Sequence, residues 1–160
     1  MQHNIPDLLL MYISFAKANQ MWFHSAHHLS KGKSFAGDHE LLYGKIYETL
    51  TLDLDMIVEK AVSFADSEIF ACPIVISQMT AKVLKLFSSP ANCSDMEIAE
   101  LAYNAIEQLL QNLESLHAIL KNSNNLSLGF EDLLAGFANQ YETYIYMLKQ
   151  RLKEETYYDY

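Results

Sequence analysis

Two histidines, His27 and His39, flank a short polar segment that contains glycine in an otherwise apolar chain. Farther along, Asp55 and Glu59 lie four residues apart, which places both acids on one face of a helix. Helical bundles use inward-facing imidazoles and carboxylates of this kind to hold transition metals. Metal binding is therefore the chemistry these residues could perform, although a lone histidine is more often a core or capping residue and acids on helices are usually solvated.

Two weaker signals for metal binding also occur. His24 and His28 lie four residues apart and therefore share one face of a helix. Glu114 and His117 lie three apart, a spacing that builds carboxylate-bridged di-iron sites, but such sites need two copies of the motif and the chain has one. The sequence shows no glycine-rich phosphate loop and no recognisable serine or cysteine nucleophile, so metal binding remains the chemistry that its motifs suggest.

Length and composition indicate a helical protein of one domain, which we expect to span residues 1–160. Only five glycines and three prolines occur, and this composition favours helices. Twenty acidic against eleven basic residues give a formal net charge of −9, which opposes binding to a phosphate backbone. Two cysteines are too few for a disulfide framework, and no apolar stretch reaches the roughly 20 residues of a membrane span. We therefore expect a cytoplasmic protein.

Helices must position the candidate residues, because apolar side chains recur at helical spacing along most of the chain. Asn4 and Asp38 can each cap a helix, and Ser94 with Glu97 has the spacing of a capping box. Long helices are predicted over residues 4–30, 38–65, 94–120 and 130–152, with a shorter one over 74–87. Four apolar stripes can be buried only against one another, which predicts an all-α, ferritin-like four-helix bundle with the short helix in a crossover connection.

The segment that holds the two histidines resembles the signature of the Dps mini-ferritins, the DNA-protection-during-starvation family. That signature has a histidine, then Lys-Gly four and five residues on, a phenylalanine at eight and His-Glu at twelve. Residues 54–60 also resemble the family's Asp-x-x-x-Glu segment, with Asp55 and Glu59 as its acids, and residues 130–148 are similar to its last helix. The residues that match the first signature are His27, Lys31, Gly32, Phe35, His39 and Glu40.

The resemblance implies a hollow dodecameric shell that oxidises Fe(II), preferably with hydrogen peroxide, stores the ferric mineral and protects against oxidative damage. The family's ferroxidase sites lie at two-fold interfaces, so that His27 and His39 of one subunit would face Asp55 and Glu59 of its partner as iron ligands. His28 stands where the family commonly has tryptophan, and it either adds a ligand or fills space. The terminal segments lack the lysine-rich tail of DNA-binding members, so we expect no tight DNA binding.

Two departures from the signature concern the chain after His39. The family's aspartate four residues later is Tyr43 here, a further possible ligand that lacks a carboxylate's charge. Asp55 also lies one residue farther from His39 than in the family, and one added residue turns the rest of an α-helix by about 100°. We expect a π-bulge near Tyr43 and Gly44 to absorb it and return both acids to the interface. The alternatives are a shell or helical-bundle binding protein that has lost the oxidase, or a monomeric helical interaction module.

Overall fold

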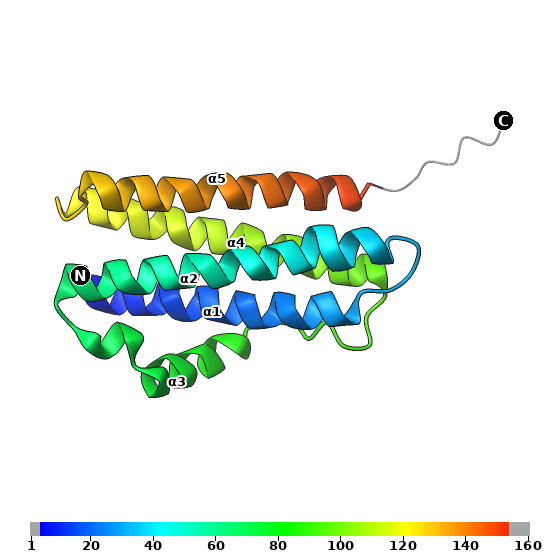
Figure 1. Ribbon diagram of the computed structural model, residues 1–160, viewed down its shortest axis with the longest axis horizontal. Coiled ribbons are helices and arrows are strands. Elements are labelled where there is room, and N and C mark those ends of the chain that lie inside the picture. The colour runs from blue at the N-terminus through cyan, green and yellow to red at the C-terminus, as the bar shows by residue number, and fades with distance from the viewer. Residues whose placement is uncertain (1–3, 154–160) are drawn as a thin grey trace.

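The computed structural model describes residues 4–153, and within that range it is built from helices without strands. Four long helices lie side by side (Figure 1): α1 spans Ile5–Leu29, α2 Gly44–Ala65, α4 Asp95–Asn122 and α5 Leu128–Arg151. A shorter helix, α3 over Pro73–Leu84, packs along α1. A π-helical segment, Gly37–Tyr43, leads directly into α2, and a 3-10 turn, Glu68–Ala71, precedes α3. The predicted four-helix bundle with one short extra helix is confirmed.

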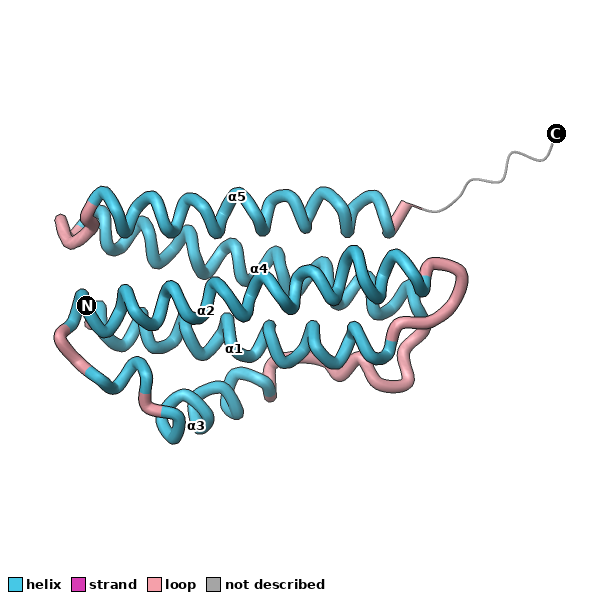
Figure 2. Tube along the Cα trace, viewed as in Figure 1, coloured by secondary structure: helices cyan, strands magenta, loops and turns pink. Residues whose placement is uncertain are grey.

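The order of the helices produces a long crossover. A loop joins α1 to α2 at one end of the bundle, and another joins α4 to α5 at the opposite end (Figure 1 and Figure 2). The connection from α2 to α4 carries α3 and runs back along the length of the bundle. As a result α2 and α4 point in the same direction, which is the single-crossover arrangement of ferritin-like bundles.

The core lies between the four long helices because each of them turns an apolar stripe inward. Phe23 of α1, Ile46 of α2, Leu109 of α4 and Phe137 of α5 are each at most 1% exposed. Taking one side chain of this size out of water contributes about 1.5–3 kcal/mol to folding. On α4 the predicted stripe is buried at Ile98, Ala105, Leu109, Leu113, Leu116 and Leu120.

One carboxylate lies inside this core, on α2. Asp53 is 2% exposed and accepts a hydrogen bond from the Tyr141 hydroxyl, with 2.9 Å between the oxygens. The Tyr141 hydroxyl in turn lies 3.4 Å from that of Tyr12. Burial raises the pKa of Asp53 to about 6, although the hydrogen bond from Tyr141 acts to lower it. The charged form of Asp53 is therefore disfavoured inside the bundle.

The helix ends agree only in part with the predicted caps. Ser94 and Glu97 form the expected capping box: the Glu97 N–H donates to Ser94 Oγ at 3.2 Å, and the Ser94 N–H donates to the Glu97 carboxylate at 2.6 Å. The Asn4 side chain makes no capping hydrogen bond to α1, so that prediction was wrong. Asp38 does not cap α2 either, because it lies inside the π-helical segment and its carboxylate binds Arg151.

The short helix α3 ends earlier than its apolar pattern indicates. It begins at Pro73, in the first turn where proline is tolerated, and stops at Leu84. The N–H groups of Leu86 and Phe87 then bond to carbonyls three residues back, which closes turns instead of continuing an α-helix. Phe87 still packs on the core, with its ring centroid 5.5 Å from that of Phe15, and this burial explains why the apolar pattern continued past the helix end.

None of the described helices is both long enough and apolar enough to cross a membrane. The first three residues and residues 154–160, on which the expectation about DNA depends, lie outside the described residues. That expectation therefore stays a prediction.

Candidate metal centre

The π-helical segment Gly37–Tyr43 contains His39, the second of the two signature histidines, and shapes the backbone that holds it. The Gly44 N–H donates to the carbonyl of His39, five residues back, where an α-helix would bond four back. This confirms the predicted bulge near Tyr43 and Gly44, although it is a longer segment than a single turn. Because the irregularity ends before α2 begins, α2 continues as a regular α-helix to Ala65.

His27, near the end of α1, and His39, in the π-helical segment, lie face to face. Their ring centroids are 3.8 Å apart and their planes differ by 15°. Each Nδ1 lies 2.7 Å from the backbone carbonyl oxygen of the other histidine, so the two residues form a reciprocal pair of hydrogen bonds. The structure therefore brings together the two imidazoles that the sequence singled out.

The reciprocal bonds determine where the protons lie. A carbonyl oxygen can only accept, so Nδ1 of His27 and of His39 must each carry the hydrogen. In the neutral ring, Nε2 then keeps its lone pair and can bind a metal, and a backbone partner at Nδ1 is the usual way of fixing a histidine ligand. The Glu40 carboxylate lies 3.3 Å from Nε2 of His39, so an acidic oxygen lies beside that nitrogen. The pair thus offers two oriented nitrogen donors beside an acid.

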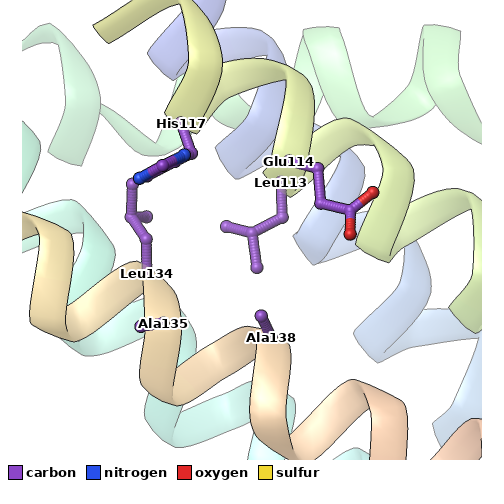
Figure 3. Close-up of a pocket in the computed structure, with 6 residues that line it drawn as sticks. All are labelled: Leu113, Glu114, His117, Leu134, Ala135 and Ala138. Atoms are coloured by element: carbon purple, nitrogen blue, oxygen red, sulfur yellow. The ribbon is translucent and has the colours of Figure 1, made fainter. Parts of the chain in front are cut away.

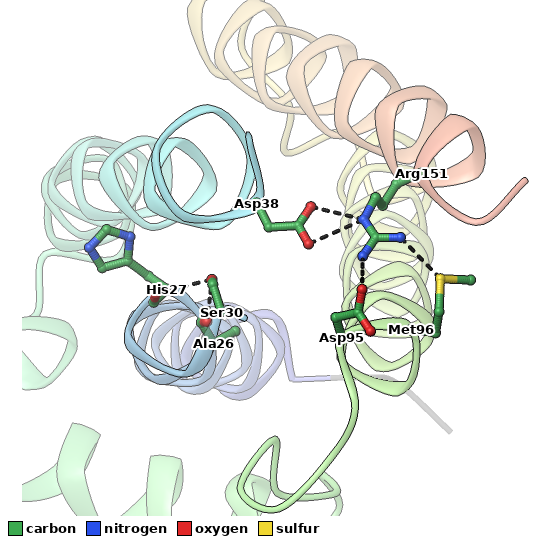
Figure 4. Close-up of polar contacts among 7 residues, drawn as sticks. All are labelled: Ala26, His27, Ser30, Asp38, Asp95, Met96 and Arg151. Carbon is green, nitrogen blue, oxygen red and sulfur yellow. Dashed lines mark hydrogen bonds and ion pairs between the residues drawn. The ribbon is translucent and has the colours of Figure 1, made fainter. Parts of the chain in front are cut away.

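Gly44 makes room for this pair. A Cβ added at Gly44 would lie 2.5 Å from the carbonyl oxygen of His39, 2.9 Å from Nδ1 of His27 and 3.2 Å from its Cε1. On the other side, Ser30 Oγ donates to the carbonyl of His27 at 3.1 Å, sharing that acceptor with His39 (Figure 4). A small residue at position 44 is therefore a steric requirement of the histidine geometry.

Arg151, at the end of α5, clamps the start of the π-helical segment. Its Nε lies 3.0 and 3.1 Å from the two carboxylate oxygens of Asp38, and another guanidinium nitrogen lies 2.9 Å from the Asp95 carboxylate at the start of α4 (Figure 4). Burial alone would lower the pKa of Arg151, but the hydrogen bonds to Asp38 and Asp95 outweigh it and raise that pKa. The His27 ring points away from this cluster (Figure 4), so the clamp positions backbone and does not supply ligands. Sequence reasoning missed it, because contacts between residues so far apart in the chain leave no local pattern.

Tyr43, the residue in place of the family's aspartate, is packed in the core. It is 1% exposed, its ring centroid is 6.4 Å from that of Phe23, and its hydroxyl has no hydrogen-bond partner among the described residues. Burial, and then the nearby Asp38 carboxylate, raise the pKa of the Tyr43 hydroxyl well above its ordinary value. Tyr43 is therefore a neutral phenol inside the bundle, and to act as a ligand it would have to leave the core.

Asp55 and Glu59 lie together, but far from the histidine pair of the same chain. Both are exposed on α2 and line a surface pocket of about 280 Å³ with Lys17 of α1. Asp55 is 16 positions after His39, which corresponds to about 24 Å along helical backbone. Within residues 4–153, no group of three or more histidine, cysteine or acidic side chains of one chain is arranged to hold a metal ion. A centre that uses both the histidines and these acids would therefore require two chains.

A second pair of imidazoles lies next to the first. Nε2 of His24 is 3.1 Å from Nε2 of His28, and both residues are exposed. The His28 ring also lies against that of His27, with 5.0 Å between centroids. Partial desolvation, and then the neighbouring His24, lower the pKa of His28. His28 is thus paired with His24, a contact that the four-residue spacing indicated.

The single di-iron-like motif on α4 does not form a ligand pair. His117 Nε2 lies 3.1 Å from the Glu131 carboxylate of α5, which also accepts a bond from Lys121 at 3.1 Å. Figure 3 shows the Glu114 carboxylate turned away from the His117 ring, on the other side of a small apolar pocket. The hydrogen bond and the Lys121 charge lower the pKa of Glu131. His117 is therefore hydrogen-bonded to the Glu131 carboxylate beside the Lys121–Glu131 ion pair that joins α4 and α5.

Comparison with known proteins agrees with this architecture. No family model matches the sequence, and neither does any curated protein. A Dps protein from Vibrio cholerae O1, described as a member of a broad superfamily of ferritin-like diiron-carboxylate proteins, superposes with a TM-score of 0.75 at 15% identity, over 93% of this chain and 89% of that one. Dps from Thermosynechococcus elongatus superposes with a TM-score of 0.75 at 16% identity, over 98% and 94% of the two chains. The chain thus has the ferritin-like helical-bundle fold of Dps proteins.

Proposed function

We propose that this chain is a Dps-like mini-ferritin, which assembles into a hollow dodecameric shell and oxidises Fe(II) with hydrogen peroxide at sites between subunits. Iron is the substrate and the stored cargo of this activity. The ligands would be His27 and His39 of one subunit with Asp55 and Glu59 of its two-fold partner. By consuming Fe(II) and peroxide together in the cytoplasm, the protein would protect the cell against oxidative damage.

The observation that carries this proposal is the reciprocal bonding of the two histidines. Both Nδ1 atoms are tied to backbone carbonyls, so that His27 and His39 present Nε2 in fixed orientations. Imidazole nitrogen suits Fe(II), whereas carboxylate oxygen, the donor of Asp55 and Glu59, is a harder ligand that suits the ferric product. A mixed set of this kind favours the loss of an electron from iron.

The separation of the two half-sites supports a shared centre. One chain cannot close the distance of about 24 Å between His39 and Asp55, whereas a two-fold axis would place each half opposite its complement. The π-helical segment is consistent with this arrangement, because it adds the extra residue without interrupting α2, which presents the acids. The pocket at Asp55 and Glu59 opens at the surface, where a partner could enter it.

The chemistry balances with peroxide as the oxidant. Two Fe(II) ions each give one electron to one H₂O₂, the O–O bond breaks, and two protons are taken up to give two Fe(III) ions and two water molecules. In this step His27 and His39 hold the reduced ion through neutral nitrogens, and the carboxylates of Asp55 and Glu59 compensate the additional positive charge that oxidation leaves. The chain itself is neither oxidised nor reduced.

Subunit mixing provides the sharpest test. His27→Gln and the double variant Asp55→Asn, Glu59→Gln should each lower the peroxide-driven ferric absorbance rise toward the protein-free rate. When the two variants are unfolded together and co-assembled in equal amounts, about a quarter of the sites regain a complete ligand set, because a mixed two-fold interface contains one intact and one doubly impaired site. The matched control is His117→Gln, since His117 is bound to Glu131 on another face and should not affect the rate.

Each result has a defined meaning. Recovery on mixing supports an intersubunit centre, whereas two inactive variants that stay inactive when mixed would contradict it. A wild-type assembly of large size that oxidises Fe(II) no faster than buffer would instead indicate a shell that has lost the oxidase. Elution as a monomer in size-exclusion chromatography would refute the shell itself.

A further inference from the structure

A second imidazole pair on α1 has no role in the proposed ferroxidase centre. His24 and His28 lie one helical turn apart, are exposed, and place their Nε2 atoms 3.1 Å from each other. Their ring planes differ by 64° and their centroids are 4.7 Å apart, so the two Nε2 atoms are closer to each other than the ring centres are. This geometry differs from that of His27 and His39, whose rings are parallel and whose Nδ1 atoms bind backbone.

The distance between the two nitrogens matches that between two ligand atoms bound to the same small cation. Two nitrogens that each lie about 2.0–2.1 Å from one metal ion, at angles between octahedral and tetrahedral, are about 2.9–3.4 Å apart. The observed 3.1 Å falls inside this range. A direct hydrogen bond between the rings could also bring the nitrogens together, but between exposed groups such a bond exchanges with water and contributes only about 0.5–1.5 kcal/mol.

Neighbouring aromatic rings hold the pair in place. The His24 ring stacks on Tyr47 of α2, with centroids 4.5 Å apart and planes within 19°. The His28 ring also contacts that of His27, at 5.0 Å between centroids. Contacts on both flanks restrict the rotamers of the two histidines before any ligand arrives, which reduces the entropy lost on binding.

We propose that His24 and His28 form a separate surface site for a first-row divalent transition-metal ion, bound through both Nε2 atoms with water in the remaining positions. Imidazole nitrogen is a suitable donor for Fe(II), Ni(II), Cu(II) and Zn(II), and the net charge of −9 attracts cations to the surface. The site shares no ligand with the four residues of the proposed ferroxidase centre. It therefore stands whether or not that centre oxidises iron.

Nickel titration of the full-length protein tests the site, because Ni(II) is not oxidised under these conditions. The double variant His24→Gln, His28→Gln should bind about one Ni²⁺ per chain fewer than wild type in isothermal titration calorimetry. The double variant His27→Gln, His39→Gln should still bind that one Ni²⁺ per chain, and His117→Gln should bind as much Ni²⁺ as wild type does. If the His24, His28 double variant binds as much Ni²⁺ as wild type with equal affinity, the proposal is wrong.

A second measurement on the wild-type chain does not depend on variants. Diethyl pyrocarbonate modifies exposed imidazole nitrogens, and fragmentation of the labelled peptides by mass spectrometry distinguishes His24, His27 and His28. Saturating Ni²⁺ should suppress labelling of His24 and His28 together, while a distant histidine, His117, keeps its level. Equal labelling of His24 and His28 with and without Ni²⁺ would overturn the assignment even if the protein bound nickel elsewhere.

Discussion

Replacing Gly44 with alanine should destabilise the protein and separate the histidine pair. The added methyl group would lie 2.5 Å from the carbonyl oxygen of His39 and 2.9 Å from Nδ1 of His27. The first contact is with backbone, which cannot rotate away, and the second is with a ring that is held by a hydrogen bond. Some part of the segment around His39 must therefore move.

The expected magnitude follows from the cost of overpacking. An extra methyl group in a closely packed site costs about 1–3 kcal/mol, and we expect Gly44→Ala to lie at the upper end because two atoms are displaced at once. Gly136 is the matched control, since it also lies within a helix and a Cβ there would meet nothing within 4 Å. Gly136→Ala should therefore stabilise the protein by about 0.5–1 kcal/mol, so the two substitutions have opposite signs.

Urea denaturation at one fixed chain concentration measures both effects, because assembly would otherwise shift the apparent stability. The Fe(II) and peroxide assay should in addition show a slower ferric rise for Gly44→Ala and an unchanged rise for Gly136→Ala. A Gly44→Ala protein that is as stable as Gly136→Ala would refute the steric argument. A Gly44→Ala protein that is destabilised as expected but oxidises Fe(II) at the wild-type rate would refute the connection between Gly44 and the histidine geometry.

Two further substitutions test buried charges by urea denaturation. Asp53 has a pKa of about 6 in the fold against 3.8 for a free carboxyl, so its contribution to stability is complete below pH 4 and is lost as the pH rises through 6. Asp53→Asn should remove this pH dependence, and its free energy of unfolding should exceed that of wild type at pH 8 by up to about 3 kcal/mol. An unchanged dependence of stability on pH would contradict the burial of this carboxyl. Arg151→Met should cost about 3–5 kcal/mol because it leaves the buried carboxylate of Asp38 without its cation, and adding Asp38→Asn should recover part of the loss. The exposed Lys45 is the control, since Lys45→Met should change the free energy of unfolding by less than about 1 kcal/mol. If Arg151→Met and Lys45→Met lowered the stability equally, the contacts of Arg151 would contribute no more than those of an exposed cation.

The fold was largely predictable from the sequence because its signals are local. Apolar residues at helical spacing located the four long helices, and the Ser94 and Glu97 capping box marked the start of α4 to the residue. The extra residue between His39 and Asp55 even indicated where a π-helical turn had to lie. The predicted helix boundaries were wrong where a polar side chain binds a distant partner. Asp38, for example, was predicted to cap a helix, but in the structure its carboxylate binds Arg151.

The candidate site was predictable in its residues but not in its geometry. Similarity to the Dps signature singled out His27 and His39, yet the bonds from each ring to the other's carbonyl depend on how two helices meet, which no spacing encodes. The buried position of Tyr43 was equally out of reach, because a tyrosine is compatible with either a core or a surface position on a helix. Asp53 went unnoticed for the same reason, since only packing distinguishes it from its solvated neighbour Asp55.

The face-to-face histidine pair also bears on how tightly a metal could be held. Because His27 and His39 immobilise each other during folding, the rotamer freedom of both rings is lost before any ion arrives. Ordering a side chain at the moment of binding costs about 0.5–1.5 kcal/mol, so two rings ordered in advance make binding more favourable by about 1–3 kcal/mol. That difference corresponds to about five- to 150-fold in affinity. A shell of the proposed kind would thus keep its nitrogen donors ready between successive iron ions, without reordering the end of α1 or the π-helical segment that carry them.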